Sequence, residues 1–102
     1  MDIYTIMVFE KLERNKSGYP DFGSQRVVGF YTNKDDAFHD VQINALDIRE
    51  CAYSYALIER VEEGVYGTTH SRYFFKYNEE KNMYEEIEEP NYLNNFIGFT
   101  IG

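Results

Sequence analysis

The chain has 102 residues, 43% hydrophobic and 27% charged, and carries a net charge of −8 at pH 7. This length and balance are typical of one globular domain, and they exclude disordered, collagen-like and low-complexity chains. Two features depart from an average composition: 18 acidic against 10 basic residues, and 10 Tyr with 8 Phe but no Trp. We therefore expect a single domain over residues 1–102 whose acid and aromatic content reflects its function.

Composition also excludes several classes of function. No apolar run approaches the ~18 to 20 residues of a membrane span, and charged residues interrupt the first 15 positions, so we expect a cytoplasmic protein without a membrane partner. Cys51 is the only cysteine, which excludes an intramolecular disulfide and a CxxC pair. An acidic chain repels phosphate, so direct nucleic-acid binding is not expected.

In chain order, residues 3–12 predict a strand, and both of its faces are apolar, which favours a central position in a sheet. Turn-forming residues fill 14–24 and predict a surface loop. Residues 25–31 predict a second strand. Thr32 or Asn33 can then cap a helix.

The helix is predicted from residue 34 to residue 49 or 51, with Asp35 and Asp36 in its first turn, where the helix dipole favours negative charge. Its apolar stripe comprises Phe38, Val41, Ala45, Ile48 and Ala52, and Asp36, Asp40 and Asp47 lie opposite. Ile43 projects with the aspartates. Exposed single aliphatic residues are common, so this position predicts an exposed side chain, with a partner contact as the alternative.

The second half of the chain predicts three strands and a short helical turn. Residues 53–62 form one strand, and 72–77 with 83–87 form a hairpin around 78–82, where Asn tolerates a left-handed conformation. Pro90 ends the last strand and can open the helical turn. The predicted fold is therefore α+β, an antiparallel sheet of about five strands with one main helix on one face.

One helix of about four turns cannot cover five strands. The second face must be covered by loops and the C-terminal segment, stay wet, or be buried by another chain. Tyrosine suits such a surface because its ring is apolar and its hydroxyl tolerates water. The candidates for self-association into a homo-oligomer, a homodimer in the simplest case, are Tyr73, Phe75, Tyr77, Phe96 and Phe99.

The clearest local bias is acidic. Residues 79–89 contain six glutamates and one lysine, with Tyr84 among them. Such a run is typical of a solvated face, and on an edge strand it also discourages unwanted strand pairing. It can also steer a basic protein partner while embedded apolar residues make short-range contacts. The candidate partner-binding residues are Glu79, Glu80, Tyr84, Glu85, Glu86, Glu88 and Glu89.

The inventory for catalysis is thin, and no catalytic residue, metal site or cofactor is predicted. His39 follows a core position on the helix and is expected to be solvated. His70 lies in a polar turn, where a ligand-binding or acid–base role competes with a purely conformational one. Cys51 follows the predicted helix rather than opening one, so it predicts a buried filler rather than a thiolate. The histidines and cysteine lack the close spacing of a zinc site.

Three segments share a general pattern: residues 28–37, residues 55–64, and residues 73–77 followed by Tyr84 and Pro90. They resemble small α+β proteins of bacteria and their phages for which no activity is assigned. The resemblance is a general pattern over residues 3–90 and implies no functional residue. In size and acidity the chain is also similar to phage inhibitors that mimic nucleic acid with carboxylates, an analogy of composition alone.

The sequence thus favours a non-enzymatic interaction domain that self-associates and offers residues 79–89 to a basic partner. The first alternative is a small-ligand-binding or hydrolytic domain using His70 with Tyr73 and Glu59. The second is a nucleic-acid mimic that inhibits a DNA-binding enzyme.

Overall fold

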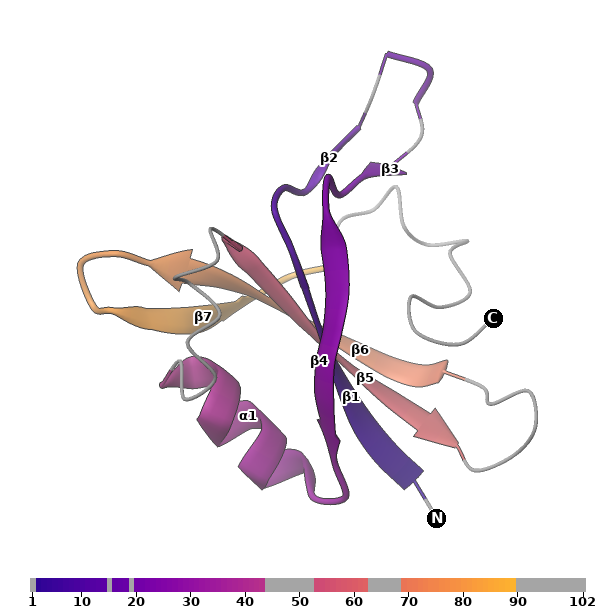
Figure 1. Ribbon diagram of the computed structural model, residues 1–102, viewed down its shortest axis with the longest axis vertical. Coiled ribbons are helices and arrows are strands. Elements are labelled where there is room, and N and C mark those ends of the chain that lie inside the picture. Colours follow the sequence, from indigo (N-terminus) through magenta and orange to yellow (C-terminus); the bar gives the residue numbers. More distant parts are fainter. Residues whose placement is uncertain (1, 15, 19, 44–52, 63–68, 90–102) are drawn as a thin grey trace.

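The computed structural model describes residues 2–14, 16–18, 20–43, 53–62 and 69–89, which form an α+β fold. Five strands make one antiparallel sheet in the order β4-β1-β5-β6-β7, and α1 lies against one side of it (Figure 1). These elements are β1 (Asp2–Phe9), β4 (Gln25–Tyr31), α1 (Lys34–Gln42), β5 (Tyr55–Glu62), β6 (Thr69–Asn78) and β7 (Met83–Ile87). The predicted fold class, the sheet of five strands and the order of the main elements are confirmed. The short helical turn predicted after Pro90 lies outside the described residues.

β1 is an inner strand, as its two apolar faces predict. It pairs with β4 on one side and β5 on the other. Ile6 and Val8 belong to the core beneath the helix, whereas Met7 and Phe9 belong to a second core on the opposite face. Side chains alternate across a strand, so a strand that is apolar at successive positions can be stable only with cover on both faces.

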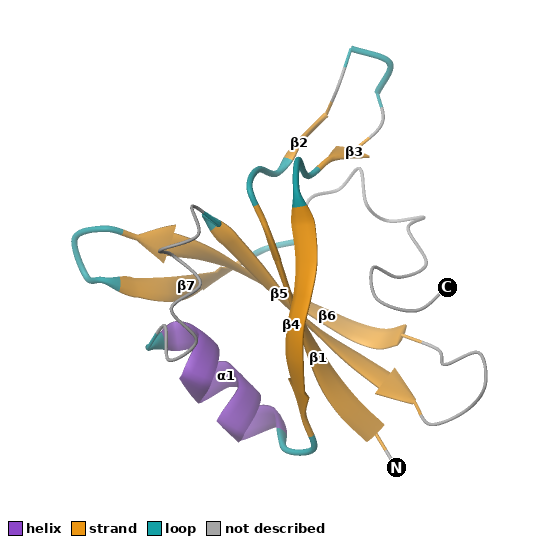
Figure 2. Cartoon of the chain, viewed as in Figure 1, coloured by secondary structure: helices purple, strands orange, loops and turns teal. Residues whose placement is uncertain are grey.

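The segment after β1 is more ordered than the loop that the sequence predicts. Two short strands, β2 (Glu13–Arg14) and β3 (Pro20–Asp21), pair with each other and extend beyond the ends of β1 and β4 (Figure 2). Phe22 follows β3 and is buried, with its ring centroid 5.3 Å from that of Phe9. The sequence did not predict this ladder, because turn-forming residues fill the segment and a two-residue strand leaves no periodic pattern.

α1 begins as predicted and ends earlier than predicted. The Asn33 side chain accepts a hydrogen bond from the Asp36 amide at 3.1 Å, which is a standard N-cap. The helix ends at Gln42, with Ile43 as its C-cap, instead of at residue 49 or 51. The backbone of Ile43, with ψ near 3°, is no longer α-helical, although the apolar spacing in the sequence continues beyond it. The predicted stripe positions Ala45, Ile48 and Ala52 lie outside the described residues.

The sheet buries a core on each face. The helix-side core contains Ile6, Val8, Ala37, Val41, Ala56, Ile58, Phe75 and Tyr84. The opposite core contains Met7, Phe9, Phe22, Leu57 and Phe74. The face that α1 does not cover is partly covered by the β2–β3 segment, because Phe22 packs there.

The β6–β7 hairpin forms where predicted. Asn82 has a φ of 52°, the left-handed conformation that asparagine tolerates better than most residues. Asn78 opens the turn, and its side-chain oxygen accepts hydrogen bonds from the amides of Glu80 and Lys81 at 3.0 and 3.3 Å. The turn is thus built from two asparagines acting in different ways.

Candidate functional site

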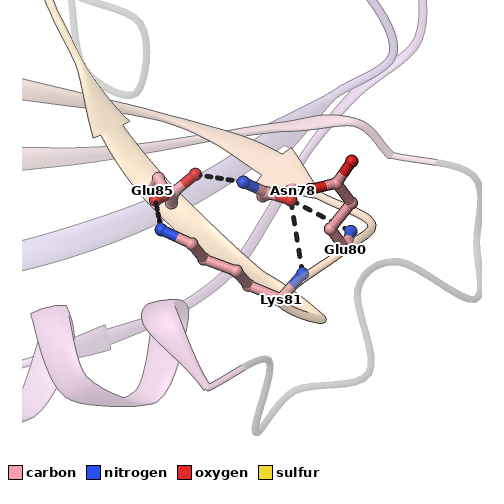
Figure 3. Close-up of polar contacts among 4 residues, drawn as sticks. All are labelled: Asn78, Glu80, Lys81 and Glu85. Carbon is pink, nitrogen blue, oxygen red and sulfur yellow. Dashed lines mark hydrogen bonds and ion pairs between the residues drawn. The ribbon is translucent and has the colours of Figure 1, made fainter.

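The acidic hairpin is the candidate site, and its polar contacts divide its glutamates into distinct groups. The Asn78 amide donates to Glu85 at 2.5 Å, and the Lys81 ammonium lies 3.1 Å from the other Glu85 oxygen (Figure 3). The Asn78 hydrogen bond, followed by the Lys81 contact, lowers the pKa of Glu85 below its ordinary value. Glu85 therefore organises the hairpin rather than offering an unpaired charge to a partner.

Glu89 is also engaged within the chain. Its carboxylate accepts an ion-paired hydrogen bond from Arg72 Nε at 2.7 Å, and the Arg72 side chain is only 11% exposed. Arg72 belongs to β6, so this pair joins the segment after β7 back to the neighbouring strand. Glu80, Glu86 and Glu88 are exposed, and no contact of their carboxylates is found among the described residues. Glu79 is exposed and makes a further contact within the chain.

Strand geometry distributes the run over both faces of the sheet. Tyr84 is buried on the helix side, and Glu86 follows two residues later on that side, whereas Glu85 lies between them and projects to the other side. The carboxylates therefore do not form one continuous row. A phosphate-like row, which a nucleic-acid mimic requires, is not supported by this arrangement.

Tyr84 is a core residue rather than a contact residue. Its side chain is fully buried, and its hydroxyl donates to the Tyr53 carbonyl at 2.6 Å. Its ring also meets the Tyr77 ring edge-to-face, with centroids 5.0 Å apart. The expectation that Tyr84 contacts a partner is corrected, because the acidic side chains around it conceal a position on the buried side of β7.

Two hollows flank the hairpin and border on Ile87. One, of about 510 Å³, is lined by Lys76, Tyr77, Asn78, Glu79, Glu80, Glu85 and Ile87. The other, of about 610 Å³, is lined by Arg72, Tyr73, Glu86, Ile87, Glu88 and Glu89. Each is lined by Ile87, one tyrosine, three glutamates and one basic residue, Lys76 or Arg72, so carboxylates are in excess. That combination matches a lysine or arginine side chain, which has an apolar stem and a cationic end.

The aromatic residues predicted for self-association lie mostly beneath the helix. Phe75 is fully buried, and Phe38 of α1 packs edge-on against both Phe75 and Tyr73, at 5.3 and 4.9 Å between centroids. Tyr77 is half-buried on the same side. Phe75 therefore offers no surface to another chain, and α1 occupies much of the surface of Tyr73. Phe96 and Phe99 lie outside the described residues.

The residues proposed for ligand chemistry do not converge. Tyr73 projects to the helix side of the sheet, whereas Glu59 is fully buried and projects to the opposite side, level with Leu57. A site built from both side chains is therefore excluded by the strand register. His70 lies in strand β6 and not in the polar turn that the sequence predicts. Its side chain lies outside the described parts of the structure, and so does Cys51. His39 is 68% exposed and contacts Asp40 at 3.2 Å, as expected of a solvated histidine.

One exposed apolar surface, on β4, was not predicted from the sequence. Val27 and Phe30 of β4 are 48% and 63% exposed, and they lie opposite Met7 and Thr5 in the register. Both therefore project to the side of the sheet away from α1. Regular alternation would place positions 27 and 30 on different faces, but a β-bulge at Val28 shifts the pattern. The only signal in the sequence was Gly29, since glycine inside a strand often marks a bulge.

Comparisons with protein-family models, curated proteins and solved structures find no match. Among the described residues, no helix has the length and apolar character needed to cross a membrane. Within the same part of the chain, no three His, Cys, Asp or Glu side chains are grouped as metal ligands would be.

Proposed function

We propose that this chain is a non-enzymatic protein-interaction domain that self-associates and presents its β6–β7 hairpin to a basic protein partner. The observation that carries the docking proposal is the pair of hollows beside β7, each lined by Ile87 and a tyrosine together with exposed carboxylates. Glu80, Glu86 and Glu88 supply long-range attraction, and the hollows supply short-range contact for lysine or arginine side chains.

The internal pairs support this division of roles. Glu85 and Glu89 hold the hairpin and the strand end in place through Lys81, Asn78 and Arg72. The exposed carboxylates can then meet a cationic surface without first breaking an ion pair to any of the residues that the structure describes. Electrostatic attraction of this kind increases the association rate more than it increases affinity, and salt screens it.

The test reverses only the exposed charges. The variant Glu80→Lys, Glu86→Lys, Glu88→Lys is compared with the control Glu10→Lys, Glu13→Lys, Asp35→Lys, which has the same net charge and alters exposed residues elsewhere. Both variants and the wild type are used as bait in quantitative affinity capture, and captured proteins are purified for titration at two salt concentrations. We expect the hairpin variant alone to lose the basic partner.

The proposal is wrong if the hairpin variant retains every protein that the wild type captures, or if the control loses the same proteins equally. Circular dichroism and urea unfolding establish that each variant is folded. Duplex DNA added as a competitor tests the alternative of a nucleic-acid mimic, for which partner binding and DNA binding would exclude each other. A partner that binds in the presence of DNA removes that alternative.

A further inference from the structure

We propose that two copies of this chain associate by antiparallel pairing of β4 with β4, which extends the sheet across a two-fold axis. This inference rests on the self-association part of the proposed function but assigns it to a surface other than the predicted aromatic residues. The second copy is the occupant because the β4 edge is complementary to itself in register, in its exposed apolar residues and in charge.

β4 is an edge strand with little protection. It pairs with β1 on one side, and in Figure 1 it crosses in front of the rest of the sheet with none of the described helices or strands over it. Over its seven residues its only charged side chain is Arg26, and it has no proline. The other edge, β7, is shorter and carries Glu85 and Glu86. Charged and short edges resist pairing, so of the two edges of the described sheet β4 is the one better suited to accept a new strand.

The bulge selects one register for this pairing. Val28 packs on the helix side, and Gly29 lies opposite Ile6 on that same side. Antiparallel strands place residues of the same face opposite each other. Because the bulge puts both Val28 and Gly29 on the helix side, opposed residues of the two copies lie on the same face all along β4 only when Val28 lies opposite Gly29 of the second copy. Bulges usually discourage edge pairing, and here the bulge disfavours every other symmetric register.

In this register, the two exposed apolar residues meet. Val27 lies opposite Phe30 of the second copy, and the two-fold axis repeats the contact. A branched aliphatic opposite an aromatic residue is a favourable cross-strand pair. The dimer would therefore cover the side chains that are now 48% and 63% exposed on the face away from α1.

Charges on the helix side are also complementary. Arg26 is exposed, and no ion-pair partner for it is found in the described residues. In the same register it faces Tyr31 of the second copy, whose hydroxyl donates to Asp40. The hydrogen bond to Asp40, then burial, and then the charges of Asp40 and Asp36 raise the pKa of Tyr31. Each Arg26 thus approaches the acidic Tyr31 end of the other copy, next to exposed His39.

The first test is solution mass by sedimentation equilibrium at micromolar concentration. We expect twice the 12.1 kDa chain mass for the wild type. Phe30→Lys should weaken dimerisation by about 30-fold or more, the effect of losing a central aromatic contact. Ile43→Lys, at a 53% exposed position outside β4, is the matched control and should dimerise normally. Arg26→Asp should weaken the dimer, and adding Asp36→Arg should restore part of it.

The second test measures the register by cross-linking, in chains that carry Cys51→Ser. Equal amounts of Val27→Cys and Phe30→Cys chains are mixed and oxidised. Opposed antiparallel residues are about 4.5 to 5.5 Å apart at Cα, within disulfide range. Val27 and its own symmetry copy are offset by three residues, about 10 Å along the strand. The mixture should therefore cross-link and Val27→Cys alone should not.

A wild type that stays monomeric at every concentration overturns the proposal, as does a dimer that Phe30→Lys leaves unchanged. Cross-linking of Val27→Cys with itself overturns the register. These results are separable from the docking proposal, because partner capture is measured on hairpin variants with intact β4. A monomer whose hairpin variant loses its partner would refute the β4 pairing and support the docking surface.

Discussion

The glutamates of the hairpin are alike in sequence and differ in what their carboxylates contact. Glu85 lies between an amide and an ammonium group, Glu89 pairs with a largely buried guanidinium, and Glu86 is exposed to solvent. A partner can bind the Glu86 carboxylate at little cost, whereas binding those of Glu85 and Glu89 requires breaking their contacts within the chain. The effect of removing each carboxylate should differ accordingly.

The pH dependence of stability should reveal the role of Glu85. Its pKa in the folded chain is below the ordinary value of 4.5, so its ionised form stabilises the fold above that value. This contribution is lost as the pH falls through the lowered pKa of the folded state. We expect Glu85→Gln to be less stable than the wild type in urea unfolding at about pH 7, with the difference shrinking toward about pH 3.

Glu86→Gln is the matched control for this measurement, since it alters the next residue, whose carboxylate has no contact among the described side chains. Its stability should follow that of the wild type across the same pH range. A Glu85→Gln difference that is constant from neutral to acid pH would show that the ionised carboxylate does not stabilise the hairpin.

At the scale of elements, α1 depends on how it starts. The described helix has nine residues, too few to be stable in isolation, and it is held by its cap and by Ala37 and Val41 in the core. Asn33→Ala removes the acceptor for the Asp36 amide and should cost about 1 kcal/mol of stability in urea unfolding. Asn33→Ser should retain most of it. An equal loss for both variants would show that the cap is not the cause.

At the scale of the whole molecule, stability requires cover on both faces of the sheet. Phe22 comes from the segment after β3 and packs on Phe9, so it contributes to the core that α1 does not reach. Phe22→Ala should cost about 3 kcal/mol, a large part of the stability of a domain of this size. The midpoint of urea unfolding measures the loss.

Ile43→Ala serves as the control for that substitution, because it truncates a side chain that is 53% exposed. It should change stability by less than about 0.5 kcal/mol. If Phe22→Ala were as mild as this control, the β2–β3 segment would not be a structural part of the second core.

Whether a structural feature of this chain could be predicted from sequence depends on how local its causes are. Asn33 and Asn82 were predictable because capping and the left-handed conformation depend on one residue and its neighbours. The length of α1 was overestimated because apolar spacing continues after Gln42, although the backbone leaves the helix there. The β2–β3 ladder was missed because two-residue strands are stabilised by pairing and not by periodicity.

The sequence by itself determined the α+β class, the five main strands, the inner position of β1 and the hairpin around Asn78 and Asn82, since side-chain periodicity and turn chemistry are local. Tertiary structure decided which side chains are available for function. It buried Tyr84 and Phe75, separated Tyr73 from Glu59, and exposed Val27 and Phe30 together. The physical reason is that exposure depends on strand register, on the bulge in β4 and on which face α1 covers, and all three are set by pairing between distant parts of the chain.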